Sequence, residues 1–498
     1  MPTSLQSRNN ADHSAPVKPR SGLLYWAECA IDDLHRVRSR FDADPVHDLR
    51  VAIRRCRSMA QGLRGIDPTP GWKQFRGLAK PLFSSLGELR DTQVLEGWLS
   101  SLAPQTDPLR AVLSAEFAHR EAERKRDARR VINSFNAKRW WKLSKELDQR
   151  ARRLTTGSKV FQLLALERWM EAHQLHETAM RTHRDADLHQ LRIAIKRFRY
   201  TVENFLPEHH RRWSQDLKYV QDLLGEVHDL DLLLAEVTQT DPAAAAASEL
   251  TARIHSERMK RVSEYEHKMT GSLEMWGAWR DGLPIGRELS LTVTAKLRHW
   301  SRTLAPDPAH SQRVAKASIK LWRELRRELG WPFDGRATVL LRAAAFLHDV
   351  GEDKGKKRRQ SYRAKIVGKL SVPVGWSEAE MRIVQLVSRY CSGPMPSSAD
   401  VEFAALPWPV QRHIARLAGV LRLADALETG ETTFRNLRAR KVNGVVLLFV
   451  DEFDVLSNHA LEVAAARQLF EASEDVAILL RKAPTVSENV LGAVAAAG

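Results

Sequence analysis

Two stretches of the chain repeat one pattern of imidazole and cationic side chains, the first from His47 to Arg57 and the second from His189 to Arg199. Both place these groups at offsets 0, +3, +7 and +10. On a helix that advances about 100° per residue, those offsets fall within one quadrant. The quadrant holds His47, Arg50, Arg54 and Arg57 in the first copy, and His189, Arg192, Lys196 and Arg199 in the second. One imidazole and three cations, twice, favour a site that holds a long polyanion.

The opposite side of each predicted helix is apolar. It carries Leu49, Ile53 and Cys56 in the first copy, and Leu191, Ile195 and Phe198 in the second. Apolar residues at this spacing are typical of a helix that packs on a core with one face. We therefore predict two amphipathic helices whose basic faces line a common trough.

The repeat extends to a second motif farther along each copy. Leu-Gly-Glu-Leu-Arg-Asp at 86–91 corresponds to Leu-Gly-Glu-Val-His-Asp at 224–229. Alignment on the two glycines pairs further basic residues: Lys73 with Arg211, Lys80 with Lys218, and Arg90 with His228. We predict a duplicated helical unit, stacked about a pseudo-twofold axis, in which Asp91 and Asp229 orient arginines or cap helices.

These motifs resemble those of the CHAD family, the conserved histidine α-helical domain, over about residues 22–280. The resemblance implies a helical bundle whose basic cavity or channel binds inorganic polyphosphate, and an association with polyphosphate granules. The residues that it implies as polyphosphate ligands are His47, Arg50, Arg54, Arg57, Lys73, Lys80, Arg90, His189, Arg192, Lys196, Arg199, Arg211 and Lys218. Cations along a groove suit a polyanion without bases, and affinity comes from counterion release. The alternative is a solvated face whose cations pair with nearby carboxylates.

A second group of residues lies in the C-terminal half: His310, the pair His348-Asp349, and Asp425, each in an apolar helical context. Imidazole and carboxylate ligands suit a divalent metal such as Mn, Fe, Mg or Zn, and a bound metal activates water for attack on a phosphoester. We predict a metal site of these four residues, with His348 and Asp349 as catalytic candidates if the protein is an enzyme. The alternative is a buried polar cluster without metal.

This region resembles the C-terminal HD-like domain of the exopolyphosphatase/guanosine pentaphosphatase family over about residues 290–498. Glu352 stands where many HD proteins carry lysine, and Gln360, Ser361 and Cys391 stand where multi-metal relatives carry histidines. In that family hydrolysis belongs largely to an actin-like ATPase domain with Gly-rich loops, and this sequence contains no such loop, so the resemblance does not transfer catalysis. A basic run either feeds a polyanion to the site or is a solvated loop: Lys354, Lys356, Lys357, Arg358, Arg359, Arg363 and Lys365.

Length and composition limit the fold and the partners. With 498 residues, two or three domains are expected. The net charge of +17 indicates an anionic partner. Three scattered cysteines without a CxxC spacing fit a reducing cytoplasm. No stretch approaches the roughly 18–20 apolar residues of a membrane span, so no membrane association is expected.

We predict a mainly α protein: a disordered leader at 1–21, a CHAD domain at 22–282 with repeats at about 40–100 and 182–236, an all-α HD-like domain at 290–435, and a small α/β segment at 436–498. Residues 107–150 are expected to form long, partly exposed helical hairpins. Strands are expected at 445–450 and 476–480, around a helix at 457–472.

Two functions remain open. The first is a cytoplasmic, granule-associated polyphosphate-binding protein with an accessory HD domain. The second is a metal-dependent phosphohydrolase of polyphosphate or guanosine polyphosphates, with the CHAD domain as substrate tether. Nucleic acid is disfavoured as a partner because the basic helices lack interleaved exposed aromatics, and Trp140-Trp141 is expected to pack between helices.

Overall fold

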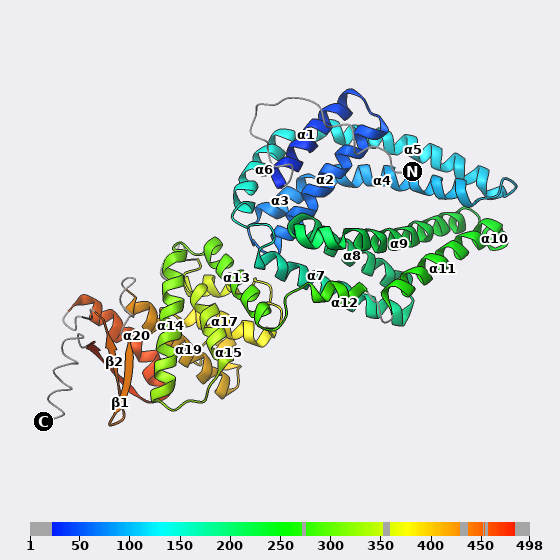
Figure 1. Ribbon diagram of the computed structural model, residues 1–498. Helices are drawn as coiled ribbons and strands as arrows, with labels where there is room; N and C mark the ends of the chain where they lie inside the picture. The colour runs from blue at the N-terminus through cyan, green and yellow to red at the C-terminus, as the bar shows by residue number, and fades with distance from the viewer. Residues whose placement is uncertain are drawn as a thin grey trace. The chain divides into compact units, whose positions relative to one another are not determined.

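The computed structural model describes residues 22–270, 275–351, 359–428, 437–451, 453 and 457–483. Within these ranges the chain forms twenty helices and one three-stranded sheet (Figure 1), which confirms the predicted mainly α fold with a small α/β end. The chain divides into two compact units. Unit 1 takes the described residues up to Gly65 and from Thr69 to Leu283, and unit 2 takes Ile66–Pro68 and those from Pro284 onward. In the described part of the chain, every helix is too short or too polar to cross a membrane.

Unit 1 contains the sequence repeat as two copies whose main helices follow in the same order. The first copy consists of α1 (Leu23–Ser39), α2 (Ala43–Arg64), α3 (Gly71–Leu78), α4 (Lys80–Leu102) and α5 (Pro108–Ser134). The second consists of α7 (Lys159–Thr182), α8 (Asp185–Phe205), α9 (Pro207–Thr240), α10 (Pro242–Ala247) and α11 (Glu249–Met269). In each copy the first two helices pack together, and α4 on α5 corresponds to α9 on α11. The copies meet where α2 contacts α8 and α4 contacts α9 (Figure 1).

The two basic helices, α2 and α8, are held by the apolar faces predicted from the sequence. The side of α2 that carries Leu49, Ile53 and Cys56 is fully buried, and so is the corresponding side of α8 with Leu191, Ile195 and Phe198. Burial of such side chains contributes about 1.5–3 kcal/mol each. The rotation of each helix about its axis is therefore fixed, and the cationic faces are held away from the core.

The starts of the long helices are set by capping residues. Asp107 precedes Pro108, and its carboxylate accepts a hydrogen bond from the Leu109 amide of α5 at 3.0 Å. The same carboxylate accepts from Ser248 Oγ at 2.7 Å, at the start of α11. Asp241 caps α10 in the same manner. One buried acid therefore fixes two corresponding helices of the two copies.

The helices expected over 107–150 are α5 and α6 (Ala137–Ala151). They do not pack chiefly on each other: α5 packs on α4, and α6 packs on α1 and α3. Trp140 is fully buried and stacks on Phe75 with ring centroids 4.0 Å apart, which confirms that it packs between helices. Unit 1 ends with α12 (Met275–Asp281).

Unit 2 has a helical core that carries the second group of predicted site residues. Its helices are α13 (Gly286–Leu304), α14 (Pro308–Glu328), α15 (Gly335–Phe346), α16 (Arg359–Val367), α17 (Glu378–Tyr390), α18 (Val401–Ala404) and α19 (Trp408–Leu427). Helix α14 packs on α15 and α19, and α17 packs on α15, α16 and α19. The three helices α14, α15 and α19 therefore surround one region of the core.

The sheet follows α19 and contains one strand that the sequence did not predict. Strands β1 (Arg438–Val442) and β2 (Val445–Val450) form an antiparallel hairpin, and β3 (Ala477–Lys482) pairs parallel with β2 after α20 (Asn458–Glu474). The hairpin turn is Asn443-Gly444, with φ of 49° and 82°, as a two-residue turn with left-handed residues requires. Strand β1 is an edge strand that buries Ala439 and exposes its charged residues, so it lacks an apolar pattern.

Candidate functional sites

Four basic residues from the two repeats gather where α2 meets α8, and we call them the cation cluster: Arg50, Arg54, Arg192 and Lys196. The cluster changes the chemistry of its lysine. Burial, together with repulsion from the three arginines of the cluster, lowers the pKa of Lys196 to about 8. The charges of both helices therefore act on one another, as a common trough requires.

Within the described residues, the members of the cation cluster make no direct ion pair. Among the described residues, no carboxylate lies within ion-pair distance of its members, nor of three further predicted ligands, Arg57, Arg90 and Arg199. The buried Nε atoms of Arg50 and Arg54 have no hydrogen-bond partner in the described part of the chain. Arg55, on another face of α2, does pair with Glu203, at 2.5 Å. The alternative in which the cations pair with nearby carboxylates therefore does not describe the cluster.

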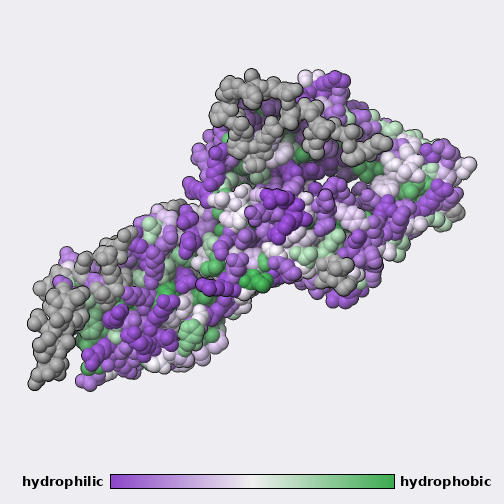
Figure 2. Space-filling model, viewed as in Figure 1, coloured by the Kyte–Doolittle hydropathy of each residue, from purple (hydrophilic) through white to green (hydrophobic). Residues whose placement is uncertain are grey.

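Two hollows border the predicted ligands, one in each repeat. The first has a volume of about 460 Å³ and is lined by His47, Arg50 and Arg90, among others. The second has a volume of about 230 Å³ and is lined by Arg192 and Lys196, among others. The visible face of unit 1 is hydrophilic and hollowed between the pair α4/α5 and the pair α9/α11 (Figure 2).

Acidic residues in the second hollow are largely compensated. Asp222 pairs with Lys218 at 2.7 Å, and Glu226 pairs with Arg261 at 2.6 Å. Burial raises the pKa of Asp229 to about 6, although Arg192 acts in the opposite direction. Burial likewise raises the pKa of the Asp91 carboxyl, the corresponding acid of the first repeat. Both groups are thus biased toward the neutral form.

The role predicted for Asp91 and Asp229 is not what the geometry shows. Within the described residues, neither carboxylate accepts a hydrogen bond from an arginine, and neither caps a helix, since both lie inside α4 and α9. They act on the cluster through space, by charge. Their motif positions predicted proximity to the arginines, but not the absence of direct contact.

The imidazoles differ between the copies. Nδ1 of His189 lies 3.3 Å from Nδ1 of His228, so one ring donates to the other. Burial, with repulsion from Arg192, lowers the pKa of His228 to about 4. His228 is therefore neutral near pH 7 where the first copy carries Arg90. His47 is exposed and lines the first hollow.

The other predicted ligands occupy three kinds of position. Arg57 is half-buried, donates to the Arg76 carbonyl at 2.7 Å, and has its pKa lowered to about 10 by burial and by Arg76. Arg199 lies over the ring of Tyr200. Lys73 of α3, Lys80 of α4, and Arg211 and Lys218 of α9 are exposed to solvent. The structure brings the α2 and α8 residues together more closely than these.

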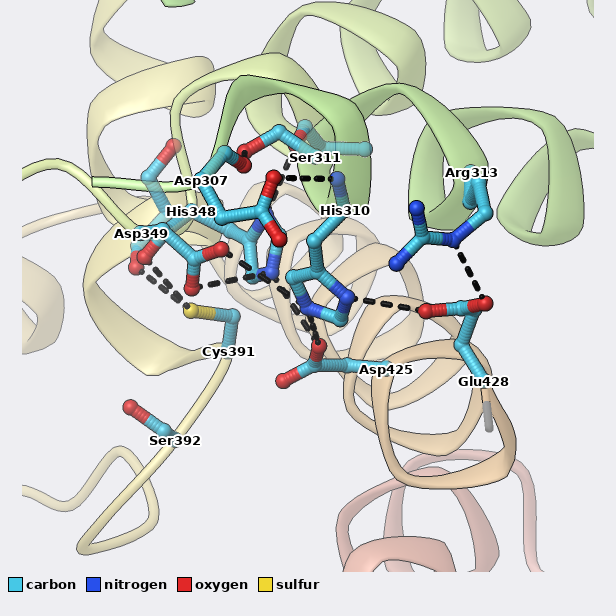
Figure 3. A network of polar contacts seen from close by, with 12 residues as sticks. Asp307, His310, Ser311, Arg313, His348, Asp349, Cys391, Ser392, Asp425 and Glu428 are labelled. Atoms are coloured by element: carbon cyan, nitrogen blue, oxygen red, sulfur yellow. Dashed lines mark hydrogen bonds and ion pairs between the residues drawn. The ribbon is translucent and has the colours of Figure 1, made fainter. Parts of the chain in front are cut away.

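In unit 2 the four predicted metal ligands converge, and we call them the His-Asp cluster: His310, His348, Asp349 and Asp425 (Figure 3). Nε2 of His310 and Nε2 of His348 lie 3.0 Å and 3.1 Å from the same Asp425 oxygen. Asp349 lies 3.1 Å from Nε2 of His348 and 3.7 Å from that of His310. One donor atom each from His310, His348 and Asp425 lie within 4.8 Å of one another.

Local structure sets each member of this cluster. Asp307 caps α14 through the Ala309 and His310 amides at 2.9 Å and 3.0 Å, which places His310 in the first turn. His348 follows the end of α15 and is fully buried. Asp425 lies in the last turn of α19. Three helix ends therefore meet at one point.

Sequence analysis missed the outer layer of this site. Glu428, whose side chain is 2% exposed, accepts from Nδ1 of His310 at 2.8 Å and from Nε of Arg313 at 2.9 Å. Nδ1 of His348 donates to the Ala345 carbonyl at 2.8 Å. Both rings therefore present Nε2 to the centre, as imidazoles that ligate metals do. The sequence did carry a signal for this contact: Glu428 lies one helical turn after Asp425, just as Arg313 lies one turn after His310.

The donor set of the His-Asp cluster fits a divalent cation. Three carboxylates surround His310, and hydrogen bonding to Asp425 raises its pKa to about 9. Burial of His348 lowers its pKa, but Asp425 and Asp349 outweigh burial and raise it overall. The pKa of Asp425 falls because both imidazoles offset its burial. The carboxylates thus stabilise positive charge at this site, either as protons on the imidazoles or as a metal ion.

One residue near the His-Asp cluster corrects an expectation. The basic run predicted either to feed a polyanion or to be a solvated loop includes Arg363, but this residue is buried and donates to Cys391 Sγ at 2.8 Å and to the Ser388 carbonyl at 3.1 Å. Its apolar stem fills the core and its Nη1 donates to internal acceptors, although its buried Nε has no partner among the described residues. Burial raises the pKa of Cys391 to about 11, so its thiol is protonated. Residues Glu352 to Arg358 of the same region lie outside the described residues.

Comparisons with known proteins agree with the two units. The family model of the CHAD domain matches residues 30–238, and that of the Ppx/GppA phosphatase, domain III, matches residues 295–472. The chain is also similar to a solved structure described as the crystal structure of the CHAD domain from the plant Ricinus communis, with 24% identity and a TM-score of 0.36, over 53% of this chain and 90% of that chain. The chain thus carries a CHAD domain followed by a Ppx/GppA phosphatase domain III.

Proposed function

We propose that the protein binds inorganic polyphosphate along the cation cluster of its CHAD domain, in the cytoplasm and on polyphosphate granules. The observation that carries this proposal is Lys196, whose ammonium group lies among Arg50, Arg54 and Arg192 without a paired carboxylate among the described residues. Such repulsion is relieved when a polyanion binds. Charge-assisted hydrogen bonds to phosphate oxygens then contribute about 1.5–3 kcal/mol each.

Polyphosphate suits the cluster better than nucleic acid does. Tyr200 is the aromatic ring beside it, and the guanidinium groups of Arg54 and Arg199 lie 5.8 Å and 6.0 Å from the ring centroid. The ring is therefore occupied by cations rather than open to a base, whereas proteins that bind single strands offer free aromatic faces. A chain of phosphates needs no such face.

The test measures binding of long-chain polyphosphate to the full-length protein, with excess DNA as competitor and at several salt concentrations. We expect binding to survive DNA and to fall steeply with salt. The triple variant Arg50→Gln, Arg192→Gln, Lys196→Gln should lose about 100-fold or more in affinity, and the slope of log K against log salt should fall by about 2.

A matched triple variant controls for net charge. Arg139, Arg153 and Lys268 are exposed cations of unit 1, and their replacement by glutamine removes the same three charges. We expect less than about a threefold change in affinity, because these groups act only through long-range, salt-screened attraction. Equal losses in both triple variants would reject the cation cluster as the site.

A metal-dependent phosphohydrolase is a second candidate function. It is supported by the convergence of His310, His348, Asp349 and Asp425, with both Nδ1 atoms tied to acceptors. These four residues would hold the ion, and Glu428 would keep His310 oriented. A divalent metal bound there would supply activation of water for attack on a phosphoester or phosphoanhydride. The CHAD domain would raise the local concentration of the substrate.

This candidate is tested by metal analysis of the purified protein and by phosphate release from polyphosphate and guanosine polyphosphates. Metal-dependent release that disappears in His348→Ala and Asp349→Ala, while polyphosphate binding persists, would establish an enzyme. Stoichiometric metal without release from any of these substrates would leave a binding protein with a metal centre. The cation-cluster triple variant should raise KM for polyphosphate rather than lower kcat.

A further inference from the structure

Unit 2 contains a basic pocket that belongs to neither site described above. It lies among α13, α14 and α15 and has a volume of about 350 Å³, the size of small-ligand sites. Four cations line it: Arg298, Lys316, Arg323 and Arg342. They come from three helices, so their convergence is a property of the fold.

These cations have no counter-ions in the described part of the chain. None of the four has an ion-pair or hydrogen-bond partner there, and the guanidinium carbon of Arg298 lies 5.9 Å from the ring centroid of Phe346. Burial lowers the pKa of Arg342, and repulsion from Arg323 and Arg298 adds to this effect. Elsewhere on α14, Arg313 and Arg327 each pair with a glutamate. An anionic acceptor from outside the chain would therefore satisfy these four cations.

The remaining walls of the pocket are mostly apolar. Ala315, Ile319 and Phe346 line it, and Phe346 is almost fully buried. Apolar walls reduce the local dielectric constant and strengthen the attraction between cations and an anion. Gln312, Lys316 and Arg323 lie on a face of α14 different from that of His310, so the pocket is separate from the His-Asp cluster.

We propose that this pocket binds a short run of adjacent phosphate groups, supplied either by an inorganic oligophosphate or by the phosphate tail of a nucleotide. Three guanidinium groups and one ammonium group match the three to four negative charges of such a ligand. The apolar wall would contact the organic part of a nucleotide. An inorganic oligophosphate would use the cations alone.

The test uses the full-length protein with the triple variant Arg50→Gln, Arg192→Gln, Lys196→Gln as background, so that the cation cluster does not contribute. Tripolyphosphate, ATP, orthophosphate and sulfate are titrated calorimetrically with EDTA present, which removes metal-mediated binding. We expect tripolyphosphate or ATP to bind at one site, and Arg342→Gln and Arg323→Gln each to weaken binding about tenfold or more.

Controls separate binding from folding. Arg323 is exposed, so its substitution should leave the melting temperature unchanged even if that of half-buried Arg342 does not. Arg302→Gln, an exposed cation of α13 outside the pocket, should bind like the background. If ATP binds more tightly than tripolyphosphate, the ligand is a nucleotide. If tripolyphosphate binds more tightly, the ligand is an inorganic chain. Binding unaffected by both pocket variants, or no preference over sulfate, would overturn the proposal.

Discussion

The cation cluster and the His-Asp cluster gather charge in opposite ways. In the first, Arg50, Arg54, Arg192 and Lys196 repel one another, and the described residues offer them no ion-pair partner. In the second, each imidazole lies 3.0–3.1 Å from Asp425, and Glu428 closes the network through His310 and Arg313. The first arrangement offers cations to an anionic ligand. The second offers carboxylates to a cation, which can take the place of the protons on the imidazoles.

This difference predicts opposite relations between stability and binding. A cluster of unpaired like charges destabilises the free protein and is relieved by ligand. A network of paired charges stabilises the free protein, and removal of one partner leaves an uncompensated buried group. Substitutions at the two sites therefore separate these two kinds of electrostatics.

The largest effect is expected at the oxygen shared by both imidazoles. Asp425→Ala removes the acceptor of His310 and His348, so the affinity for Mn²⁺ or Zn²⁺ should fall at least about 100-fold. Metal content after purification and calorimetric titration measure this loss. Glu462→Ala, an exposed carboxylate of α20, should retain wild-type affinity. Unchanged metal binding in Asp425→Ala would mean that the network is structural.

The next effect concerns the cation cluster and has two readouts with opposite signs. Lys196→Met keeps a similar stem but removes the ammonium group, so polyphosphate affinity should fall about tenfold or more. The free energy of unfolding should rise by about 1–3 kcal/mol, because a buried, repelled charge is removed. Denaturant titration and polyphosphate binding measure both. A variant that binds less and is also less stable would contradict unrelieved repulsion at Lys196.

Glu428→Gln gives a smaller effect at the His-Asp cluster. The amide keeps the shape of the side chain but has one neutral acceptor oxygen instead of two charged ones, so it favours the tautomer that presents Nε2 of His310 to the centre less strongly. Loss of an outer hydrogen bond to a ligand typically costs 10- to 100-fold in metal affinity, and we expect about tenfold. Arg313→Gln, which removes the other partner of Glu428, should have a weaker effect in the same titration. An intact affinity in Glu428→Gln would show that His310 is oriented by other contacts.

The smallest effect is the pH dependence of polyphosphate binding. Lys196 has its pKa lowered to about 8 and must be protonated when a polyanion binds, so affinity should fall about 3- to 10-fold between pH 7.5 and 9. The pKa of Asp229 is raised to about 6, so a second, smaller fall is expected as this group ionises. The Lys196→Met variant should lose the first fall and keep the second. A flat profile in the wild-type protein would exclude Lys196 from the site.

Much of unit 1 was predictable because the repeat fixes helix rotation. The offsets of His47 to Arg57, and the buried residues opposite them, specify which face is basic. The ion pairs that these basic residues form were harder to predict from the sequence. The glycine alignment predicted that Lys218 would bind polyphosphate, but Lys218 forms an ion pair with Asp222, one helical turn away. Local spacing thus predicts a face, but not which members of the face are already paired.

Unit 2 shows a second limit. His310, His348, Asp349 and Asp425 were recognisable by residue type, since buried helices rarely carry such groups without a partner. Glu428 was not recognisable, because its partner His310 lies far away in the chain. The burial of Arg363 was not recognisable either, because its basic neighbours in the sequence suggested a solvent-exposed segment. Strand β1 was missed because its charged, edge position leaves one buried residue, Ala439. Contacts between distant segments decide the positions of Glu428 and Arg363, whereas β1 is held by its local hairpin with β2.

The most direct test of the account is the reactivity of Lys196 with an amine-acylating reagent, read residue by residue by mass spectrometry with and without polyphosphate. A lysine whose pKa is lowered has a larger neutral fraction, so Lys196 should be acylated in the free protein near pH 8. Saturating polyphosphate should suppress its labelling about tenfold while exposed Lys268 stays unchanged. Equal labelling of Lys196 with and without bound polyphosphate would contradict the proposed site.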